Sequence, residues 1–289
     1  MTWAQTIQLV VPFPASSPSS ELARQLAMQM TTKLGQPVTV EYKPGGNSKV
    51  AQDYVRAAKP DGQTFLWATS AIVVEPVIAA APQEVARDLM PLALSVRSSL
   101  IMVARTELPQ RSFEQVLSYL RHGGKISCGY GGGAMLLACS ALKQISPDAV
   151  TLVPYQSSGL AVPDLVGERL DVAFMLIEPS VKSLIAADKL RLLGRTHSTS
   201  SDPLIAQSPL LNTALPALAI SPWQAWFAPK GTPPELAQRF VKAAQEVSNE
   251  PVMLKHFSDF DFRAEHLAEP EFSNYLNAEF QRYSQICVV

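Results

Sequence analysis

The sequence has no excess of basic residues and no long apolar run. It carries 24 Lys and Arg against 25 Asp and Glu, which gives a formal net charge of -1. Without a basic cluster the chain presents no face that would neutralise phosphates, which argues against a nucleic-acid partner. No apolar stretch approaches the roughly 20 residues of a membrane helix, and no signal peptide with a basic start is present. We therefore expect a protein that is not embedded in a membrane.

Cysteine is also scarce. The three cysteines, Cys128, Cys139 and Cys287, cannot all pair with one another, and their spacing fits no metal site. Isolated cysteines in apolar runs are usually small core residues, so we expect Cys128 and Cys139 to be buried, and the sequence does not decide their redox state. The glycines between Gly129 and Gly133 fit neither the phosphate-binding loop of nucleotide hydrolases nor the spacing of dinucleotide-binding folds. We expect no cofactor and no metal.

The few histidines offer little support for catalysis. A nucleophilic cysteine at position 128 or 139 would need a base within hydrogen-bond reach. The histidines, however, fall outside the strand-end loops where a cleft is expected: His122, His197, His256 and His266. A cysteine hydrolase is therefore the weaker alternative, and we expect the protein not to be an enzyme.

What the chain does have is a repeated pattern of strand, loop and helix. Its 289 residues, 47% of them apolar, suffice for one large or two ordinary α/β domains. The first unit is the apolar run 7–11, a loop rich in Pro and Ser, and a helix with Ser17 as N-cap and Pro18 at its first position. Free backbone N–H groups and hydroxyls at this helix start would suit a small carboxylate, although an ordinary capped loop is the alternative. The hydroxyls belong to Ser16, Ser17, Ser19 and Ser20.

The pattern recurs along the chain. Strand-like runs, each followed by a polar or glycine-rich loop and a helical stretch, lie at 37–42, 64–69, 125–130 and 151–155. Consecutive units of this kind build a parallel sheet, whose ligands lie beyond the carboxyl ends of the strands. The Pro-punctuated passage 196–222 is predicted to be a surface connection. Residues 270–286 are predicted to be a long helix with an aromatic core stripe.

A set of short segments spread in order over nearly the whole chain is more specific. They are Val10-Val11-Pro12-Phe13-Pro14 with Ala23-Arg24, Leu34-Gly35-Gln36-Pro37-Val38, Lys43-Pro44-Gly45, Lys59-Pro60-Asp61-Gly62-Gln63-Thr64, Ala68-Thr69-Ser70, Val153-Pro154-Tyr155 with Ser158-Gly159, Asp164-Leu165-Val166-Gly167, and Phe227-Ala228-Pro229-Lys230-Gly231-Thr232-Pro233. Together they resemble the extracytoplasmic solute receptors of the tripartite tricarboxylate transporter family, the Bug or TctC-like receptors.

The resemblance implies a two-lobed α/β fold like that of periplasmic binding proteins. Each lobe would be a mainly parallel sheet flanked by helices, and crossing strands would join the lobes. By this analogy residues 1–102 and 225–289 form one lobe, residues 103–224 form the other, and closure between them encloses a small ligand. The resemblance also implies a monomeric periplasmic receptor that works with membrane transporter subunits. Thr2-Trp3-Ala4 resembles the end of a signal-peptide cleavage site, so residues 1–5 are predicted to be the remnant of a removed signal peptide with an added Met.

Carried across residue by residue, the resemblance also implies the positions that line the ligand site. One wall comprises Phe13, Ala15, Ser16, Ser17, Ser20, Thr69, Ser70 and Ala71. The other comprises Tyr130, Gly131, Gly132, Gly133, Ala134 and Ser158, with Met175 at the back.

This chain departs from the family pattern within those walls. Ala15-Ser16-Ser17 replaces the usual Pro-Gly-Gly, and Ser20 replaces an acidic residue. Leu136 and Met175 stand where the family has His and Asp. Because a site built for hydrogen bonds loses affinity when its partners vanish, we expect a carboxylate ligand with a more apolar or aromatic body than a small dicarboxylate. An unchanged ligand, or a sensor or interaction protein with altered or lost carboxylate binding, is the alternative.

Overall fold

The computed structural model describes residues 6–82, 86–200 and 202–286. Residues 1–5, where the signal remnant was expected, and Cys287 lie outside this described part. The chain divides into two compact units. Unit 1 comprises the described residues up to Arg97, Trp223–Phe257 and Arg263–Gln281, and unit 2 comprises Ser98–Pro222, Ser258–Phe262 and the described residues from Arg282. Among the described residues, no helix combines the length and apolar character that a membrane span requires.

Unit 1 is built on a six-stranded mixed sheet with the order β11-β4-β10-β3-β1-β2. Strand β1 is parallel to β2 and β3, whereas β10 is antiparallel to β3 and β4, and β11 is antiparallel to β4. Its elements are β1 (Ile7–Val11), α1 (Pro18–Leu34), β2 (Val38–Tyr42), the short 3₁₀ helix η1 (Gly46–Ser48), α2 (Lys49–Arg56), β3 (Thr64–Thr69), α3 (Ala71–Ile78), β4 (Leu89–Arg97), β10 (Trp223–Pro229), α10 (Pro234–Ser248), α11 (Pro251–Asp259), β11 (Arg263–Ala268) and α12 (Glu271–Ser284).

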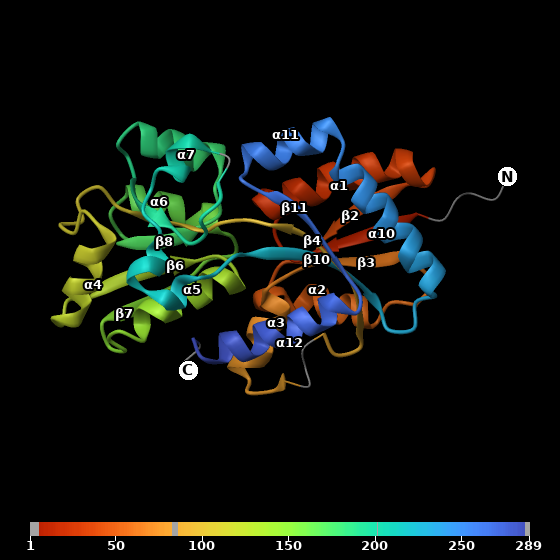
Figure 1. The fold of residues 1–289 in the computed structure, drawn as a ribbon, viewed down its shortest axis with the longest axis horizontal. Coiled ribbons are helices and arrows are strands. Elements are labelled where there is room, and N and C mark those ends of the chain that lie inside the picture. The colour runs from red at the N-terminus through yellow and green to blue at the C-terminus, as the bar shows by residue number, and fades with distance from the viewer. Residues whose placement is uncertain (1–5, 83–85, 201, 287–289) are drawn as a thin grey trace. The chain divides into compact units, whose positions relative to one another are not determined.

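Helices cover both faces of this sheet, with α1 and α10 on one face and α2, α3 and α12 on the other (Figure 1). Aromatic side chains fill the layer beneath α10. Phe65 stacks on Phe240 with ring centroids 3.7 Å apart, and Trp67 packs against Trp226 at 4.0 Å. On the opposite face the predicted stripe of α12 is confirmed as core, since Phe272 and Tyr283 are fully buried.

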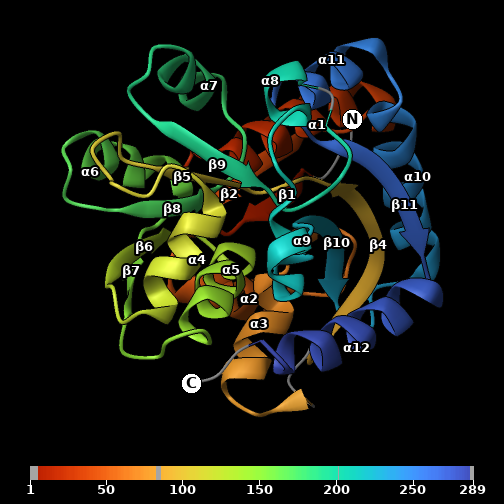
Figure 2. The same ribbon diagram turned by 60° about the vertical axis from the view of Figure 1, so that its left-hand side comes forward.

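The edge strand β11 has no counterpart among the strands expected from the sequence. Figure 2 shows it beside β4, at the edge of the unit 1 sheet. Its residues alternate between partly buried and exposed, and their sequence Arg-Ala-Glu-His-Leu-Ala contains few strand-forming residues. Pairing with β4, far away in the chain, fixes this segment as a strand.

Unit 2 is built on a five-stranded mixed sheet with the order β7-β6-β8-β5-β9. Strand β6 is parallel to β7 and β8, whereas β5 is antiparallel to β8 and β9. Its elements are β5 (Ile101–Ala104), α4 (Phe113–Arg121), β6 (Ile126–Tyr130), α5 (Gly133–Lys143), β7 (Val150–Pro154), η3 (Ser158–Ala161), α6 (Val162–Val166), β8 (Val172–Met175), α7 (Pro179–Ala186), β9 (Arg191–Arg195), α8 (Pro203–Ala206), α9 (Leu211–Ala214) and η4 (Pro216–Leu218). The predicted two-part α/β architecture is confirmed.

The passage 196–222 is not the surface connection that its prolines predicted. Ile205, Leu211 and Leu218 are fully buried in it. The guanidinium of Arg195, only 8% exposed, donates hydrogen bonds to the carbonyl oxygens of Ile205 and Ser208. Because one buried cation satisfies these backbone oxygens, the passage packs into unit 2 as short helices.

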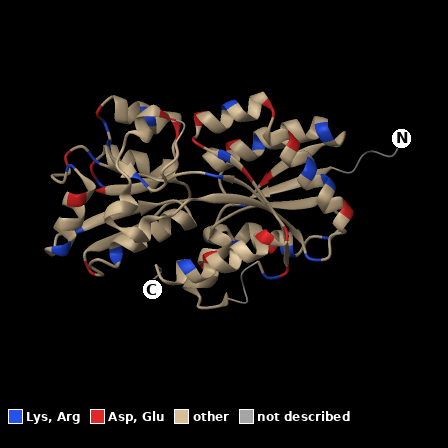
Figure 3. Cartoon of the chain, in the orientation of Figure 1, with Lys and Arg blue, Asp and Glu red and all other residues tan. Residues whose placement is uncertain are grey.

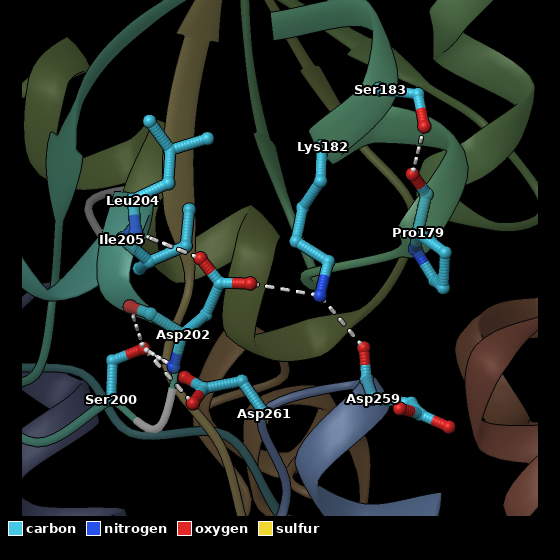
Figure 4. Close-up of polar contacts among 9 residues, drawn as sticks. All are labelled: Pro179, Lys182, Ser183, Ser200, Asp202, Leu204, Ile205, Asp259 and Asp261. Atoms are coloured by element: carbon cyan, nitrogen blue, oxygen red, sulfur yellow. Dashed lines mark hydrogen bonds and ion pairs between the residues drawn. The ribbon is translucent and has the colours of Figure 1, made fainter. Parts of the chain in front are cut away.

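A short segment that follows α11 also belongs to unit 2, where a polar cluster holds it (Figure 4). Lys182 lies 2.9 Å from the carboxylate of Asp202 and donates a hydrogen bond of 3.1 Å to the carbonyl oxygen of Asp259. Ser200 donates a hydrogen bond of 3.0 Å to the carboxylate of Asp261. After Trp223 the chain therefore contributes twice more to unit 2, at Ser258–Phe262 and in the described residues from Arg282.

Candidate functional site

In unit 1, the serine-rich loop (residues 12–20) joins β1 to α1, as predicted. Ser17 is the N-cap, and its Oγ accepts a hydrogen bond of 3.1 Å from the backbone N–H of Ser20. The Ser17 hydroxyl donates to the Ser20 Oγ at 2.9 Å, and the Ser20 hydroxyl donates to the Phe13 carbonyl oxygen at 3.3 Å. The buried hydroxyls of Ser17 and Ser20 are thus engaged with the loop itself, whereas Ala15 and Ser16 are exposed.

A second predicted segment lies at the end of the neighbouring strand. Thr69 ends β3, Ser70 follows it and Ala71 begins α3; all three are buried. The Thr69 Oγ1 accepts a hydrogen bond of 3.4 Å from the backbone N–H of Ala71. Because β1 and β3 are parallel neighbours, both predicted segments lie at the same edge of the unit 1 sheet.

Gln224 joins this edge, although it was not among the predicted residues. It lies opposite Thr69 in the pairing of β10 with β3, and its Nε2 donates a hydrogen bond of 2.8 Å to the Ser19 Oγ. The side chain is 4% exposed, and its Oε1 has no hydrogen-bond partner among the described residues. A polar residue between Trp223 and Trp226 in an otherwise apolar strand was the signal that could have found it.

In unit 2, the glycine loop (residues 130–134) joins β6 to α5. No side chain caps the start of α5, and its first turn contains no acidic residue. Backbone N–H groups at such a helix start lack intrahelical partners and lie at the positive end of the helix dipole. Open backbone donors were expected at the start of α1, but there Ser17 caps the helix. At the start of α5 the backbone donors are available to an anion.

Close packing holds the glycine loop against the loop that follows β7. A Cβ added at Gly131 would lie 2.2 Å from the Ser157 carbonyl carbon and from the Ser158 nitrogen. No side chain fits in that space, so glycine is required at this position. The contact brings Ser158, which is 3% exposed, next to the start of α5.

The structure settles the redox state of Cys128 and Cys139, which the sequence left open. Both are fully buried, as expected, and they form a disulfide with Cα atoms 5.9 Å apart. Cys128 lies on β6 and Cys139 on α5, so the bond ties together the two elements that flank the glycine loop. Neither sulfur is available as a thiolate nucleophile, which removes the basis of the cysteine-hydrolase alternative.

Glu178 is a further residue that the sequence did not single out. It follows β8 and precedes the first residue of α7, but its carboxylate does not cap that helix. Ser158 donates a hydrogen bond of 3.4 Å to Glu178 Oε1. Burial raises the pKa of Glu178 to about 7, against the smaller lowering effect of the Ser158 hydrogen bond.

The remaining predicted residues of unit 2 differ in their surroundings. Tyr130 and Leu136 are partly exposed near the glycine loop, and Ala134 is buried. Met175 is fully buried in an apolar cluster with Ile101 and Leu165. The structure therefore gathers the glycine loop and Ser158 at one edge of the unit 2 sheet, and it places the Met175 side chain in the core.

Charge and metal-binding groups add no other centre within the part of the chain that the structure describes. Lys and Arg are mixed with Asp and Glu along the helices of each unit (Figure 3). No group of His, Cys, Asp and Glu residues in the described ranges could hold a metal ion. The candidate groups are thus the hydroxyls and Gln224 in unit 1 and, in unit 2, the backbone donors of α5, Ser158 and Glu178.

Comparison with known proteins identifies the family. Residues 22–288 match the profile of the tripartite tricarboxylate transporter family receptor, TctC. A protein in the tcbD-tcbE intergenic region of Pseudomonas sp. strain P51 is 28% identical over 99% of this chain and 86% of its own. Protein BugT of Bordetella pertussis is 29% identical over 81% of this chain and 73% of its own.

Solved structures agree with the fold. A periplasmic transporter structure has a TM-score of 0.87 at 26% identity, covering 99% of this chain and 97% of its own. MatC from Rhodopseudomonas palustris with bound malate has a TM-score of 0.83 at 24% identity, covering 97% and 98%. Rpa4515 from the same organism with adipate has a TM-score of 0.86 at 22% identity, covering 98% and 97%. The chain therefore belongs to the TctC family of periplasmic solute-binding receptors, which are not enzymes.

Proposed function

We propose that this receptor captures an organic carboxylate and delivers it to the membrane subunits of a tripartite tricarboxylate-type transporter. The observation that carries the proposal is the start of α5. Its backbone donors have no side-chain cap, its first turn has no acidic residue, and Ser158 lies beside it. The related structures with malate and adipate bind carboxylates, which is the ligand class that such donors suit.

In this proposal each unit offers candidate ligand-contacting groups at the ends of its strands. Unit 1 contributes Thr69, Ser70 and the unpaired end of the Gln224 amide, and unit 2 contributes the glycine loop and Ser158. Leu136, near the start of α5, supplies apolar surface at a position where the family resemblance implies a histidine. The proposed ligand therefore carries an apolar or aromatic body next to its carboxylate.

The test is a thermal-shift screen of the purified protein with malate, adipate, octanoate and benzoate, each with its amide as control. A ligand at 100 times its dissociation constant adds about 2.7 kcal/mol of stability, which gives a clear shift. We expect the acids to shift the melting temperature and the amides not to. Absence of any shift with the acids would remove the carboxylate assignment and favour a sensor or interaction role.

A variant that introduces a negative charge tests where the ligand carboxylate binds. Leu136→Glu places a negative charge in the first turn of α5, where it opposes an anion. Ser118→Glu places the same charge on the exposed face of α4 in the same unit. We expect Leu136→Glu to lose the shift and Ser118→Glu to keep it; equal shifts in the two variants would move the ligand away from α5.

A further inference from the structure

Glu178 is a partly buried acid without a counter-charge. It is partly exposed, and its single hydrogen-bond donor in the described chain is Ser158. A Cβ added at Gly159 would lie 3.4 Å from both carboxylate oxygens of Glu178, so the backbone of η3 covers the carboxyl group closely. Glu178 thus lies at the carboxyl end of β8, against the same loop that Gly131 contacts.

The charged side chains on the elements around Glu178 interact with other partners. Lys182, one turn later on α7, is bound to Asp202 and to the Asp259 carbonyl oxygen. On α6, which packs against η3, Asp164 accepts hydrogen bonds from Tyr155 and Arg169. The strands β6 and β8, which also pack against η3, carry no charged residue.

The two protonation states of Glu178 act oppositely on an anionic ligand. An ionised carboxylate at this edge repels a ligand carboxylate and has no cation in the described chain to offset it. A protonated carboxyl group instead offers an O–H donor, and carboxyl O–H to carboxylate oxygen is among the strong hydrogen bonds. The covered position and the lack of a counter-charge favour the protonated acid, as does the raised pKa.

We propose that Glu178 is a ligand-binding residue that acts as a protonated acid, donating a hydrogen bond to the ligand carboxylate, so that capture weakens as the pH rises. This inference rests on the proposed function and deepens it. Together with the helix start at α5 and Ser158, Glu178 gives unit 2 a carboxylate cradle without any cationic side chain. Ligand uptake at pH 8 then draws close to one proton from solution.

The experiment is calorimetric titration of the intact receptor with malate and adipate at pH 6, 7 and 8 and at constant ionic strength. Because the pKa of Glu178 in the ligand-free receptor is about 7, the affinity of the wild type for the ligand should fall about tenfold from pH 6 to pH 8. Glu178→Gln keeps an N–H donor without a titrating proton, so its affinity should stay within about twofold of the wild-type value at pH 6. Glu114→Gln, on exposed α4, should keep the wild-type slope.

Each other outcome overturns the inference. A flat or rising affinity in the wild type, or the same slope in Glu178→Gln, shows that Glu178 does not donate to the ligand while carboxylate capture itself stands. Loss of binding in a folded Glu178→Gln, which keeps both a donor and an acceptor, shows that capture needs the ionised carboxylate instead. Binding of neither probe at any pH removes the carboxylate assignment and this role with it. If Glu178→Gln does not fold, the wild type is titrated at pH 8 in buffers of different ionisation enthalpy, which measures the protons taken up on binding. Binding without proton uptake would contradict the proposal.

Discussion

The serine-rich loop of unit 1 and the glycine loop of unit 2 occupy equivalent positions, each between a parallel strand and a helix. They differ in how the backbone N–H groups at the start of that helix are satisfied. In unit 1, the Ser17 side chain caps α1. The Ser17 hydroxyl donates to Ser20, and the Ser20 hydroxyl donates to the Phe13 carbonyl oxygen. In unit 2, α5 begins without a side-chain cap, and a disulfide spans its loop. A loop rich in hydroxyls can thus be closed to ligand, whereas a loop of glycines leaves its backbone donors open.

The comparison shows where rigidity comes from in each loop. The serine-rich loop is ordered by short local hydrogen bonds, each worth about 1 kcal/mol. In the glycine loop, the Cys128–Cys139 bond and the close approach of Gly131 to Ser157 restrain the chain. We therefore expect the two loops to respond to different substitutions.

The largest expected effect is at Gly131. Gly131→Ala would place a Cβ 2.2 Å from the backbone of Ser157 and Ser158, and because backbone cannot move aside cheaply, unfolding free energy should fall by about 3 kcal/mol or more. Gly159→Ala is the matched control, since its Cβ would come no nearer than 3.4 Å to any atom. Urea denaturation measures both; similar small losses in the two variants would contradict the tight loop contact.

Removal of the disulfide should have the next largest effect. Closing a loop between residues separated by 11 positions stabilises a protein by roughly 3 kcal/mol, so Cys128→Ala/Cys139→Ala should lose about that amount. Amide hydrogen exchange should rise in residues 129–138 and stay unchanged in residues 12–20. Cys287→Ser, which leaves the bond in place, serves as control. Equal exchange in the wild type and in the double variant would show that the bond does not order the glycine loop.

The pH dependence of stability gives a smaller effect confined to unit 2. The folded-state pKa of Glu178, about 7, exceeds the ordinary value of 4.5, so its favourable contribution is complete below pH 4.5 and is lost as the pH rises through 7. Glu178→Gln should therefore gain about 2 kcal/mol over the wild type at pH 8 and little at pH 4.5. Thermal melts of the two proteins across this range, with Glu114→Gln beside them, measure it; a constant difference would contradict burial of the acid.

The smallest expected effect is in unit 1. Ser17→Ala removes the N-cap of α1 and should cost about 1 kcal/mol. Ser16→Ala, in the same loop but exposed, should be nearly neutral. The difference between their urea midpoints measures the cap alone. If Ser16→Ala costs as much as Ser17→Ala, the serine-rich loop is not ordered in the way described.

Local chemistry allowed much of the fold to be predicted from the sequence. Ser17 followed by Pro18 marked the start of α1, and the aromatic stripe of α12 marked its buried face. Strand β11 was missed because Arg263 and Glu265 break its apolar pattern, and only its partner β4 specifies it. The buried passage 196–222 was misassigned because its prolines mask a packing that depends on burial of the neighbouring Arg195 guanidinium, which the sequence does not show.

The site was predictable only in part. Position in the chain located the strand-end loops, because parallel strands bring their carboxyl ends to one edge. Sequence could not show that Ser17 and Ser20 satisfy each other, nor that Cys128 and Cys139 come within bonding distance. Glu178 was invisible for a similar reason, since its properties arise from burial against η3 rather than from its neighbours in sequence.

The interleaving of the two units also sets the order in which they can be completed during synthesis. All strands of the unit 2 sheet lie between Ile101 and Arg195, so this sheet is available as soon as that stretch leaves the ribosome. The unit 1 sheet contains the first strand made, yet β10, which separates β3 from β4, is translated only after unit 2. Until then β3 and β4 have open edges that pair readily with other chains. The earliest part of the nascent chain is thus the last to be finished, and its strand edges wait longest for their partner.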